Sequence, residues 1–239
     1  MAYLELRSLI KKFNQITAVD GLCLSMSLGE IYVLLGPNGA GKTTTLRMIA
    51  GITPPSSGEI IVDGKNLVEY PTEVKSNFFF IPDRPYMYEK LTGREYLEFL
   101  INIYRRGNID STAGLLAEFD LTSRLDHLIE SYSHGMRQKL LLAAAFMLDL
   151  SMLVVDEPLV GLDPRSAAVL RKKIVEFARS GKLALISTHQ LSLAEHLATR
   201  IGILHNGRLL TEGLPKEVCS RGKSGTLEEA FLKLTEEVE

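Results

Sequence analysis

A glycine-rich segment, GPNGAGKTT (Gly36 to Thr44), constrains this sequence more than any other feature. It fits the pattern G-x-x-x-x-G-K-[ST], and its neighbours are those that the pattern requires. The wholly apolar run Ile31 to Leu35 predicts a buried central strand before it, and residues from Lys42 to about Ala50 predict a helix after it. This order predicts a parallel α/β sheet with a phosphate site at the N-terminus of the helix.

Each residue type in this segment suits the binding of phosphate. The glycines let the backbone turn tightly and bring its N–H groups close to phosphate oxygens. The helix N-terminus adds about half a positive charge. We expect Lys42 to reach the β- and γ-phosphates, the Thr43 hydroxyl to ligate Mg²⁺, and Thr44 to add a phosphate contact. The predicted binding residues are Gly36, Pro37, Asn38, Gly39, Ala40, Gly41, Lys42, Thr43 and Thr44.

Two carboxylates follow a second buried run, Met152 to Val155. Ligands of open α/β sheets bind at the carboxyl ends of the strands, which is where Asp156 and Glu157 would lie. We expect Asp156 to hold Mg²⁺, through water, and Glu157 to act as the general base that polarises the attacking water. A positioned base typically contributes about 10²–10⁴ in rate.

The composition is sufficient for a globular core and argues against some classes of binding partner, nucleic acid among them. Apolar residues make up 46% of the 239 residues, and 27 basic against 29 acidic residues give a net charge of -2. Non-specific electrostatic binding to nucleic acid is therefore not expected. The longest apolar run, Leu140 to Leu148, is far below the ~20 residues of a membrane-spanning helix. Cys23 and Cys219 show no metal-ligand spacing, and we expect both to be reduced and buried.

The remaining pattern predicts strands that alternate with helices. Capping residues mark three helix starts: Thr92 with Glu95, Ser133, and Asp163 with Pro164. The helical stretch at about 84–150 lies between strand–loop–helix segments, which indicates a helical subdomain inserted into a parallel sheet. The predicted strands are 3–8, 22–28, 57–65, 78–81, 153–155 and 183–187, with a hairpin turn at 205–208; the helices are 92–105, 111–119, 134–148, 163–181 and 227–238.

A further segment, YSHGMRQK (Tyr132 to Lys139), lies about twenty residues before the acidic pair. With this segment in place, the whole chain resembles the ATP-binding cassette (ABC) superfamily, whose signature is close to LSGGQ. The resemblance implies a RecA-like P-loop NTPase fold: a parallel-sheet core with an N-terminal antiparallel β subdomain and an inserted helical subdomain. It implies one domain over residues 1–239, with 1–83 and 150–239 as the nucleotide-binding core and 84–149 as the helical subdomain.

The resemblance also implies roles for residues outside the glycine-rich segment. The catalytic residues would be Glu157, His189 and Lys42, and the Mg²⁺ ligands Thr43, Asp83 and Asp156. Phe13 would stack on adenine, and Asp83 would contact Mg²⁺ and sense the membrane partner. Ser133, His134 and Gly135 would bind the γ-phosphate of ATP held by the opposite cassette. Asp163 would lie in the loop that crosses the dimer interface, and His189 would contact the γ-phosphate.

Three residues depart from the family pattern. Asp83 stands where the family usually has glutamine; a carboxylate binds Mg²⁺ more strongly than an amide but is shorter. His134 replaces the first signature glycine, which adds bulk and a titratable group beside phosphate. Tyr132 replaces leucine. None of the three removes a catalytic group.

The resemblance implies that ATP and Mg²⁺ are bound between two cassettes, in a homodimer or with a paralogue. A separate membrane permease would dock near Asp83 to Leu100, so that the chain lies at the cytoplasmic face of the membrane. The sequence is similar in style to exporter cassettes, and no nucleic-acid partner is expected. Four alternatives stay open: an importer cassette, a soluble ABC ATPase that acts on nucleic acid or ribosomes, another P-loop enzyme, and a catalytically inactive nucleotide switch.

Overall fold

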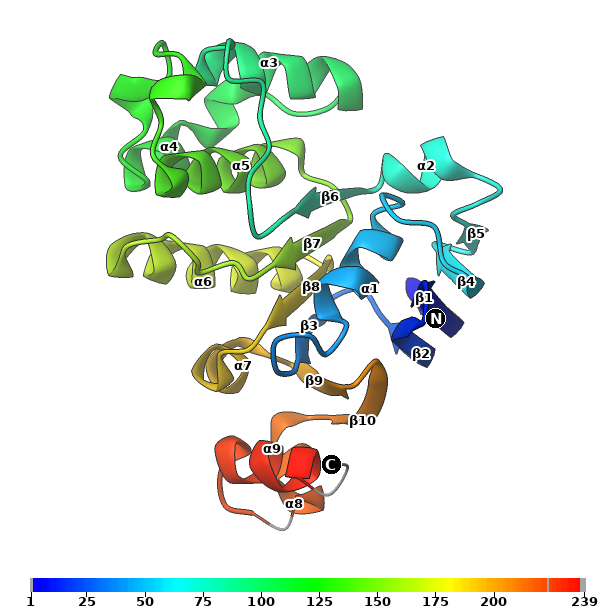
Figure 1. The fold of residues 1–239 in the computed structure, drawn as a ribbon. Helices are drawn as coiled ribbons and strands as arrows, with labels where there is room; N and C mark the ends of the chain where they lie inside the picture. The colour runs from blue at the N-terminus through cyan, green and yellow to red at the C-terminus, as the bar shows by residue number, and fades with distance from the viewer. Residues whose placement is uncertain (1, 223, 237–239) are drawn as a thin grey trace.

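The computed structural model describes residues 2–222 and 224–236, and its centre is a six-stranded sheet (Figure 1). The strands follow the order β10-β9-β3-β8-β7-β6, and all neighbours are parallel except β10, which is antiparallel to β9. They span Ile31–Leu35 (β3), Phe78–Ile81 (β6), Met152–Asp156 (β7), Leu183–Thr188 (β8), Arg200–His205 (β9) and Arg208–Gly213 (β10).

A second sheet of four antiparallel strands comes from the N-terminal part of the chain. Its order is β2-β1-β4-β5, with bounds Leu4–Phe13 (β1), Ile16–Met26 (β2), Ser57–Val62 (β4) and Lys65–Asn66 (β5). Asp63 and Gly64 both have positive φ and form the turn between β4 and β5, within the stretch 57–65 that was predicted as one strand. The α/β class and the antiparallel N-terminal sheet are therefore as predicted.

Helix α1 (Lys42–Ile49) lies between the two sheets. All five residues of strand β3 are buried, so that other elements pack on both faces of the sheet there. Ile31, Val33 and Leu35 belong to one apolar core, with the helices that follow β6; Tyr32 and Leu34 belong to the other, with α1 and the antiparallel sheet. This alternation is the period of two of a strand with both faces buried.

Three helices gather at one end of the molecule: α3 (Gly93–Tyr104), α4 (Ala113–Glu118) and α5 (His134–Leu148). In the chain they lie between β6 and β7, which are neighbours in the sheet. We propose this region, residues 84–149, as the helical subdomain. The other helices are α2 (Pro71–Lys75), α6 (Pro164–Arg179), α7 (Leu191–Leu197), α8 (Pro215–Arg221) and α9 (Leu227–Glu236), and 3₁₀ turns span Ile109–Thr112, Thr122–Arg124 and Ile129–Ser131.

The capping signals in the sequence identified three helix starts correctly. Thr92 and Glu95 form the capping box of α3, the Ser133 hydroxyl accepts from the Met136 N–H, and the Asp163 carboxylate accepts from the Ser166 N–H. The strands expected at 3–8 and 22–28 are longer and form one hairpin, β1–β2. Helices α2, α7 and α8 were not predicted, and the expected end of α9 at Val238 lies outside the described residues.

The expectation of two buried cysteines was wrong. Both are free, but Cys23 is exposed and Cys219 only half-buried. On β2 the neighbours Leu22 and Leu24 face the core, so that Cys23 points to the opposite face, where its sulfur accepts from the Ser8 N–H at 3.2 Å. Over residues 2–222 and 224–236, every helix is too short or too polar to cross a bilayer.

Candidate functional site

The glycine-rich loop lies between β3 and α1 and leaves the first N–H groups of the helix open. No side chain caps α1, and its first turn holds no acidic residue. Gly39 and Gly41 have φ of +84° and +102°, which favour glycine. A Cβ on Gly41 would lie 2.3 Å from the Ala18 carbonyl oxygen. The segment thus forms an anion cradle, in which a side chain at position 41 would collide with the Ala18 carbonyl.

Lys42 is buried at the start of α1 and is folded back over the loop. Its ammonium donates to the carbonyl oxygens of Gly36, at 2.7 Å, and Pro37, at 3.0 Å. Burial lowers the pKa of Lys42, while the charges of Glu157 and Asp156 act in the opposite direction. The two carbonyl contacts keep the cation at the mouth of the anion cradle.

Asp156 is fully buried at the end of β7, and one of its oxygens lacks a partner. The Ser187 hydroxyl donates to Oδ1, whereas Oδ2 has no hydrogen bond to any residue that the structure describes. Burial raises the pKa of Asp156; the hydroxyls of Ser187 and Thr43 act to lower it, and the charge of Asp83 acts to raise it. An unpartnered buried carboxylate oxygen beside a hydroxyl suits a hard cation such as Mg²⁺.

The donor set is incomplete without further oxygens. Within the described part of the chain, no three histidine, cysteine or acidic side chains come together as a metal site. Asp156, the Thr43 hydroxyl and Asp83 would supply only part of the six oxygens that Mg²⁺ prefers. The residues therefore fit a cation whose remaining ligands are water and substrate phosphate, not a cation held by protein alone.

Glu157 follows Asp156 and is held in a defined orientation. Its φ of +49° is rare for a residue with a side chain, and such backbone strain concentrates at functional sites. Oε1 lies 2.8 Å from Nδ1 of His189 and accepts the His189 N–H at 3.1 Å, while Oε2 accepts the Thr188 hydroxyl at 3.1 Å. The end of β8 thus fixes the carboxylate at the end of β7.

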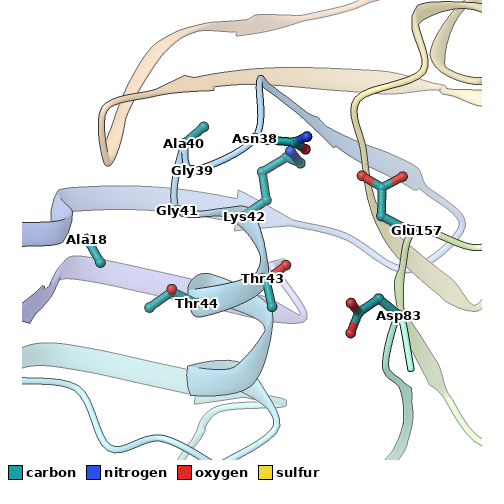
Figure 2. A pocket seen from close by; sticks show the side chains of 10 residues that line it. All are labelled: Ala18, Asn38, Gly39, Ala40, Gly41, Lys42, Thr43, Thr44, Asp83 and Glu157. Carbon is teal, nitrogen blue, oxygen red and sulfur yellow. The ribbon is translucent and has the colours of Figure 1, made fainter. Parts of the chain in front are cut away.

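Lys42 and Glu157 line one pocket of about 240 Å³ (Figure 2), whereas Asp156 and His189 stand behind its lining. Asp83 and Glu157 lie across it from the start of α1, which carries Lys42 and Thr43. The sequence did not single out Ala18 as a lining residue or Ser187 as the partner of Asp156. Ser187 and Thr188 come directly before His189, at the carboxyl end of a predicted strand, and this position was the signal that could have placed them at the site. The lining residues are Ala18, Asn38, Gly39, Ala40, Gly41, Lys42, Thr43, Thr44, Asp83 and Glu157.

Phe13 does not line this pocket. It ends β1 at the tip of the β1–β2 hairpin, where its ring is 47% exposed and the Lys11 ammonium lies 4.9 Å from its centroid. An exposed aromatic on a hairpin tip is accessible to a planar ligand, and its role in adenine stacking stays a proposal.

The signature residues lie outside the pocket. Ser133 and His134 are exposed at the first turn of α5. Asp163 caps α6 and pairs with Lys139 of α5 at 2.7 Å. The Lys139 ammonium, followed by the Ser166 donors, holds the pKa of Asp163 well below its usual range. The tip of α5 is thus accessible to another molecule, while Asp163 ties α5 to α6.

Aromatic side chains gather next to Asp83, in the segment that was expected to meet a membrane partner. Tyr86 and Tyr88 are exposed, and the Tyr88 ring meets Phe99 edge-on with a centroid separation of 5.3 Å. With Met87 and Tyr96 they line a shallow groove of about 290 Å³. Tyr96 is buried and Phe99 half-buried, so that these two also belong to the packing of α3.

Comparison with known proteins gives a consistent result. The sequence pattern of the ABC transporter family matches residues 19–160. The chain is 33% identical over 242 residues to the ABC-type transporter ATP-binding protein EcsA of Bacillus subtilis (strain 168), which covers 99% of this chain and 98% of that protein. It is 35% identical over 228 residues to the daunorubicin/doxorubicin resistance ATP-binding protein DrrA of Streptomyces peucetius, with coverage of 94% and 69%.

Solved structures show the same fold. An ATP-binding subunit of an ABC transporter superimposes with a TM-score of 0.92 and 32% identity, over 97% of this chain and 99% of the other. The fold is also that of cbiO1 from Clostridium perfringens, part of the ABC transporter complex cbiONQ, with a TM-score of 0.75 and 23% identity over 92% and 91% of the two chains.

Proposed function

Because this chain belongs to the ABC transporter family, as an ATP-binding subunit, we propose that two copies of it close on ATP and hydrolyse it. One observation carries the proposal: the two proposed halves of a nucleotide site lie in different places on one chain. The phosphate cradle and Lys42 line the pocket, whereas Ser133 is exposed on α5 and does not line it. Two chains related by a two-fold axis would pair each half with its complement.

Within one pocket, the open N–H groups of α1 and the loop bind the phosphates of ATP. Lys42 exchanges its two carbonyl partners for phosphate oxygens. Thr43, Asp156 and Asp83 would hold Mg²⁺, which, when bound, supplies charge neutralisation on the phosphates. From the second chain, the Ser133 hydroxyl and the first turn of α5, with His134 and Gly135, would meet the γ-phosphate.

Glu157 is the proposed general base. The residues at the end of β8 hold its carboxylate so that one oxygen can take the proton of a water that attacks the γ-phosphorus. His189 would orient Glu157 and reach the phosphate with its other ring nitrogen. The leaving ADP and phosphate no longer bridge the two chains, so that hydrolysis opens the dimer.

Closure and opening would drive a separate membrane permease, which docks near Asp83 to Leu100 and places the chain at the cytoplasmic face. The exposed Tyr86 and Tyr88, which follow Asp83 in the chain and line a groove with α3, support this site. That cbiO1 is part of a transporter complex supports a partner in general. Export is favoured because DrrA is named for drug resistance.

The first test is trapping of the closed dimer by Glu157→Gln with Mg²⁺ and ATP. The amide keeps the shape of the site but takes no proton, so that ATP stays intact and bridges the two chains. Size-exclusion chromatography with light scattering should show an ATP-dependent dimer, and Glu157→Gln combined with Lys42→Ala should stay monomeric. A Glu157→Gln variant that binds ATP yet stays monomeric, or that still hydrolyses it within a few-fold of the parent, would contradict the proposal.

A further inference from the structure

The imidazole of His134 lies directly against the main chain of Gly161. Gly161 has a φ of +80°, and a Cβ placed on it would lie 2.4 Å from Nδ1 and 3.1 Å from Cε1 of His134. A second close approach lies beside the first: a Cβ on Gly135 would lie 2.4 Å from the Gly161 carbonyl oxygen. The first turn of α5 and residue 161 therefore interlock through one side chain and two glycines.

Gly161 belongs to a short turn that begins at Glu157. The Val160 N–H donates to the Glu157 carbonyl at 3.2 Å, and the Leu162 N–H donates to the Leu159 carbonyl at 3.2 Å. The turn ends at Asp163, which caps α6 and binds Lys139. Since both ends of the turn are fixed, a displacement of Gly161 has to move Glu157, Asp163 or both.

We infer that His134 is a positioning residue, which sets the place of the Ser133-bearing tip of α5 relative to the turn that carries Glu157. This inference rests on the proposed function, in which Ser133 meets the nucleotide of the second chain. Binding of phosphate at Ser133 displaces the N-terminus of α5, and the contact of His134 with Gly161 transmits this displacement to the turn. The base of one composite site thereby responds to nucleotide in the other.

The contact between His134 and Gly161 acts through shape and not through charge. The partner of the imidazole is the main chain of a glycine, which offers no side chain with which to pair. Two charged groups on α5 have carboxylate partners: Lys139 binds Asp163, at the end of the same turn, at 2.7 Å, and Arg137 binds Glu89 at 2.6 Å. The His134 side chain is exposed, but the close approach of Gly135 to the Gly161 carbonyl leaves the two main-chain segments little room to move independently.

A double-mutant cycle tests the inference in the Glu157→Gln background, with the ATP-dependent dimer dissociation constant as the readout. Gly161→Ala with His134 present should weaken the dimer about tenfold, because the new methyl group meets the ring. With His134→Gly the same change should cost less than about threefold. The φ strain of alanine is equal in both backgrounds and cancels from the cycle.

Gly181 provides a matched control. Its φ is +82°, but a Cβ there would meet nothing within 4 Å. Gly181→Ala therefore imposes the same backbone strain and should leave dimerisation unchanged in either background. Thermal unfolding of each monomer separates loss of dimerisation from loss of folding, because a purely structural effect would change the melting temperature and not the cycle.

The ATP dependence of hydrolysis gives a second readout, with Glu157 restored. Positive cooperativity in the parent should approach a Hill coefficient of 1 in His134→Ala and recover in part in His134→Gln, whose planar amide again reaches Gly161. A parent that dimerises, with additive effects of His134→Gly and Gly161→Ala, overturns this inference alone. A parent that forms no ATP-dependent dimer overturns the proposed function, and this inference with it.

Discussion

Nδ1 of His189 lies 2.8 Å from Oε1 of Glu157, and the His189 N–H reaches the same oxygen at 3.1 Å. One residue thus holds one carboxylate oxygen twice, through its ring and through its main chain. A carboxylate accepts only, so the ring must carry its proton on Nδ1 in this contact. The other ring nitrogen then points away from Glu157 and is available to a substrate.

The role of His189 is tested by His189→Ala. The main-chain bond to Glu157 survives this change, but the ring bond and the second nitrogen are lost. We expect kcat to fall about 10²–10³-fold, with ATP affinity changed only a few-fold, since the phosphate cradle is untouched. The matched control is His196→Ala on α7, whose ring contacts the Ser192 carbonyl of its own helix, whereas the His189 ring contacts Glu157. Equal kcat values for the two variants would contradict the assignment.

Asp156→Asn should stabilise the nucleotide-free protein while it removes the response to the metal. Burial raises the folded-state pKa of Asp156 above its unfolded value, so that its ionised form costs stability at neutral pH. This cost disappears as the pH falls through the folded-state pKa. The melting temperature of the variant should exceed that of the parent at pH 7, by about 2–4 °C for each kcal/mol recovered, and the two should converge in acid.

The second arm of that experiment adds Mg²⁺ and ATP. Mg²⁺ and ATP together should raise the melting temperature of the parent, because a ligand that binds the folded state stabilises it. Mg²⁺ should raise the melting temperature of the variant much less. An unchanged Mg²⁺-dependent increase in Asp156→Asn would exclude Asp156 as a metal ligand. A lower melting temperature without ligand would show that its ionised form is not costly.

Asp83 should make nucleotide binding depend on the metal. Among the described residues that line the pocket, the carboxylates Asp83 and Glu157 face one cation, Lys42, so that ATP without Mg²⁺ meets excess negative charge. Asp83→Asn removes one charge at nearly constant shape. It should strengthen binding of ATP in EDTA about tenfold and weaken or preserve it in Mg²⁺. Equilibrium dialysis measures both, with the exposed Asp126→Asn as the control. Equal affinities of Asp83→Asn and parent in EDTA would count against this charge effect.

Arg200 joins the two sheets, and its loss should destabilise the fold. Its guanidinium binds Glu212 at 3.0 Å and the Ser25 carbonyl of β2 at 2.7 Å, and Glu212 also accepts the hydroxyl of the buried Tyr32 at 3.0 Å. Arg200→Ala removes the hydrogen-bond donor of the Ser25 carbonyl and the cation beside Glu212, which keeps only the Tyr32 hydroxyl of these two partners, and should cost about 1–3 kcal/mol of unfolding free energy.

The control for Arg200 is Arg208→Ala in the same region. Arg208 also pairs with a carboxylate, that of Asp20, at 2.6 Å, but its side chain is 71% exposed. Exposed pairs contribute about 0–1 kcal/mol, so this variant should unfold in urea almost as the parent does. The two-sheet contact would be unimportant if the two variants had the same midpoint.

The sequence predicted the parts of this fold that local chemistry decides. The caps at Thr92, Ser133 and Asp163 begin helices at the predicted residues, because each cap satisfies N–H groups of its own helix. The buried run Ile31 to Leu35 is a strand with the predicted bounds. Asp156 and Glu157 stand at the end of a buried strand, as predicted, and the pocket follows from the order of the strands.

Other features depend on contacts between distant segments and could not be predicted locally. Ala18 lines the pocket because the fold places its carbonyl beside Gly41, a residue distant from it in the sequence. Cys23 is exposed because of the pairing of β2, which the amino-acid type does not reveal. The contact between His134 and Gly161 joins α5 to a turn 27 residues further along the chain, and neither residue alone indicates the other.

The central claim is that Lys42 of one chain and Ser133 of another hold the same nucleotide. Mixing two chains tests it most directly, both in the Glu157→Gln background, one with Lys42→Ala and one with Ser133→Arg. Neither should dimerise alone with Mg²⁺ and ATP, and the mixture should form a dimer that retains one ATP, because one of its two composite sites is intact. A mixture that stays monomeric while the Glu157→Gln parent dimerises, or a Ser133→Arg variant that dimerises on its own, would contradict the account.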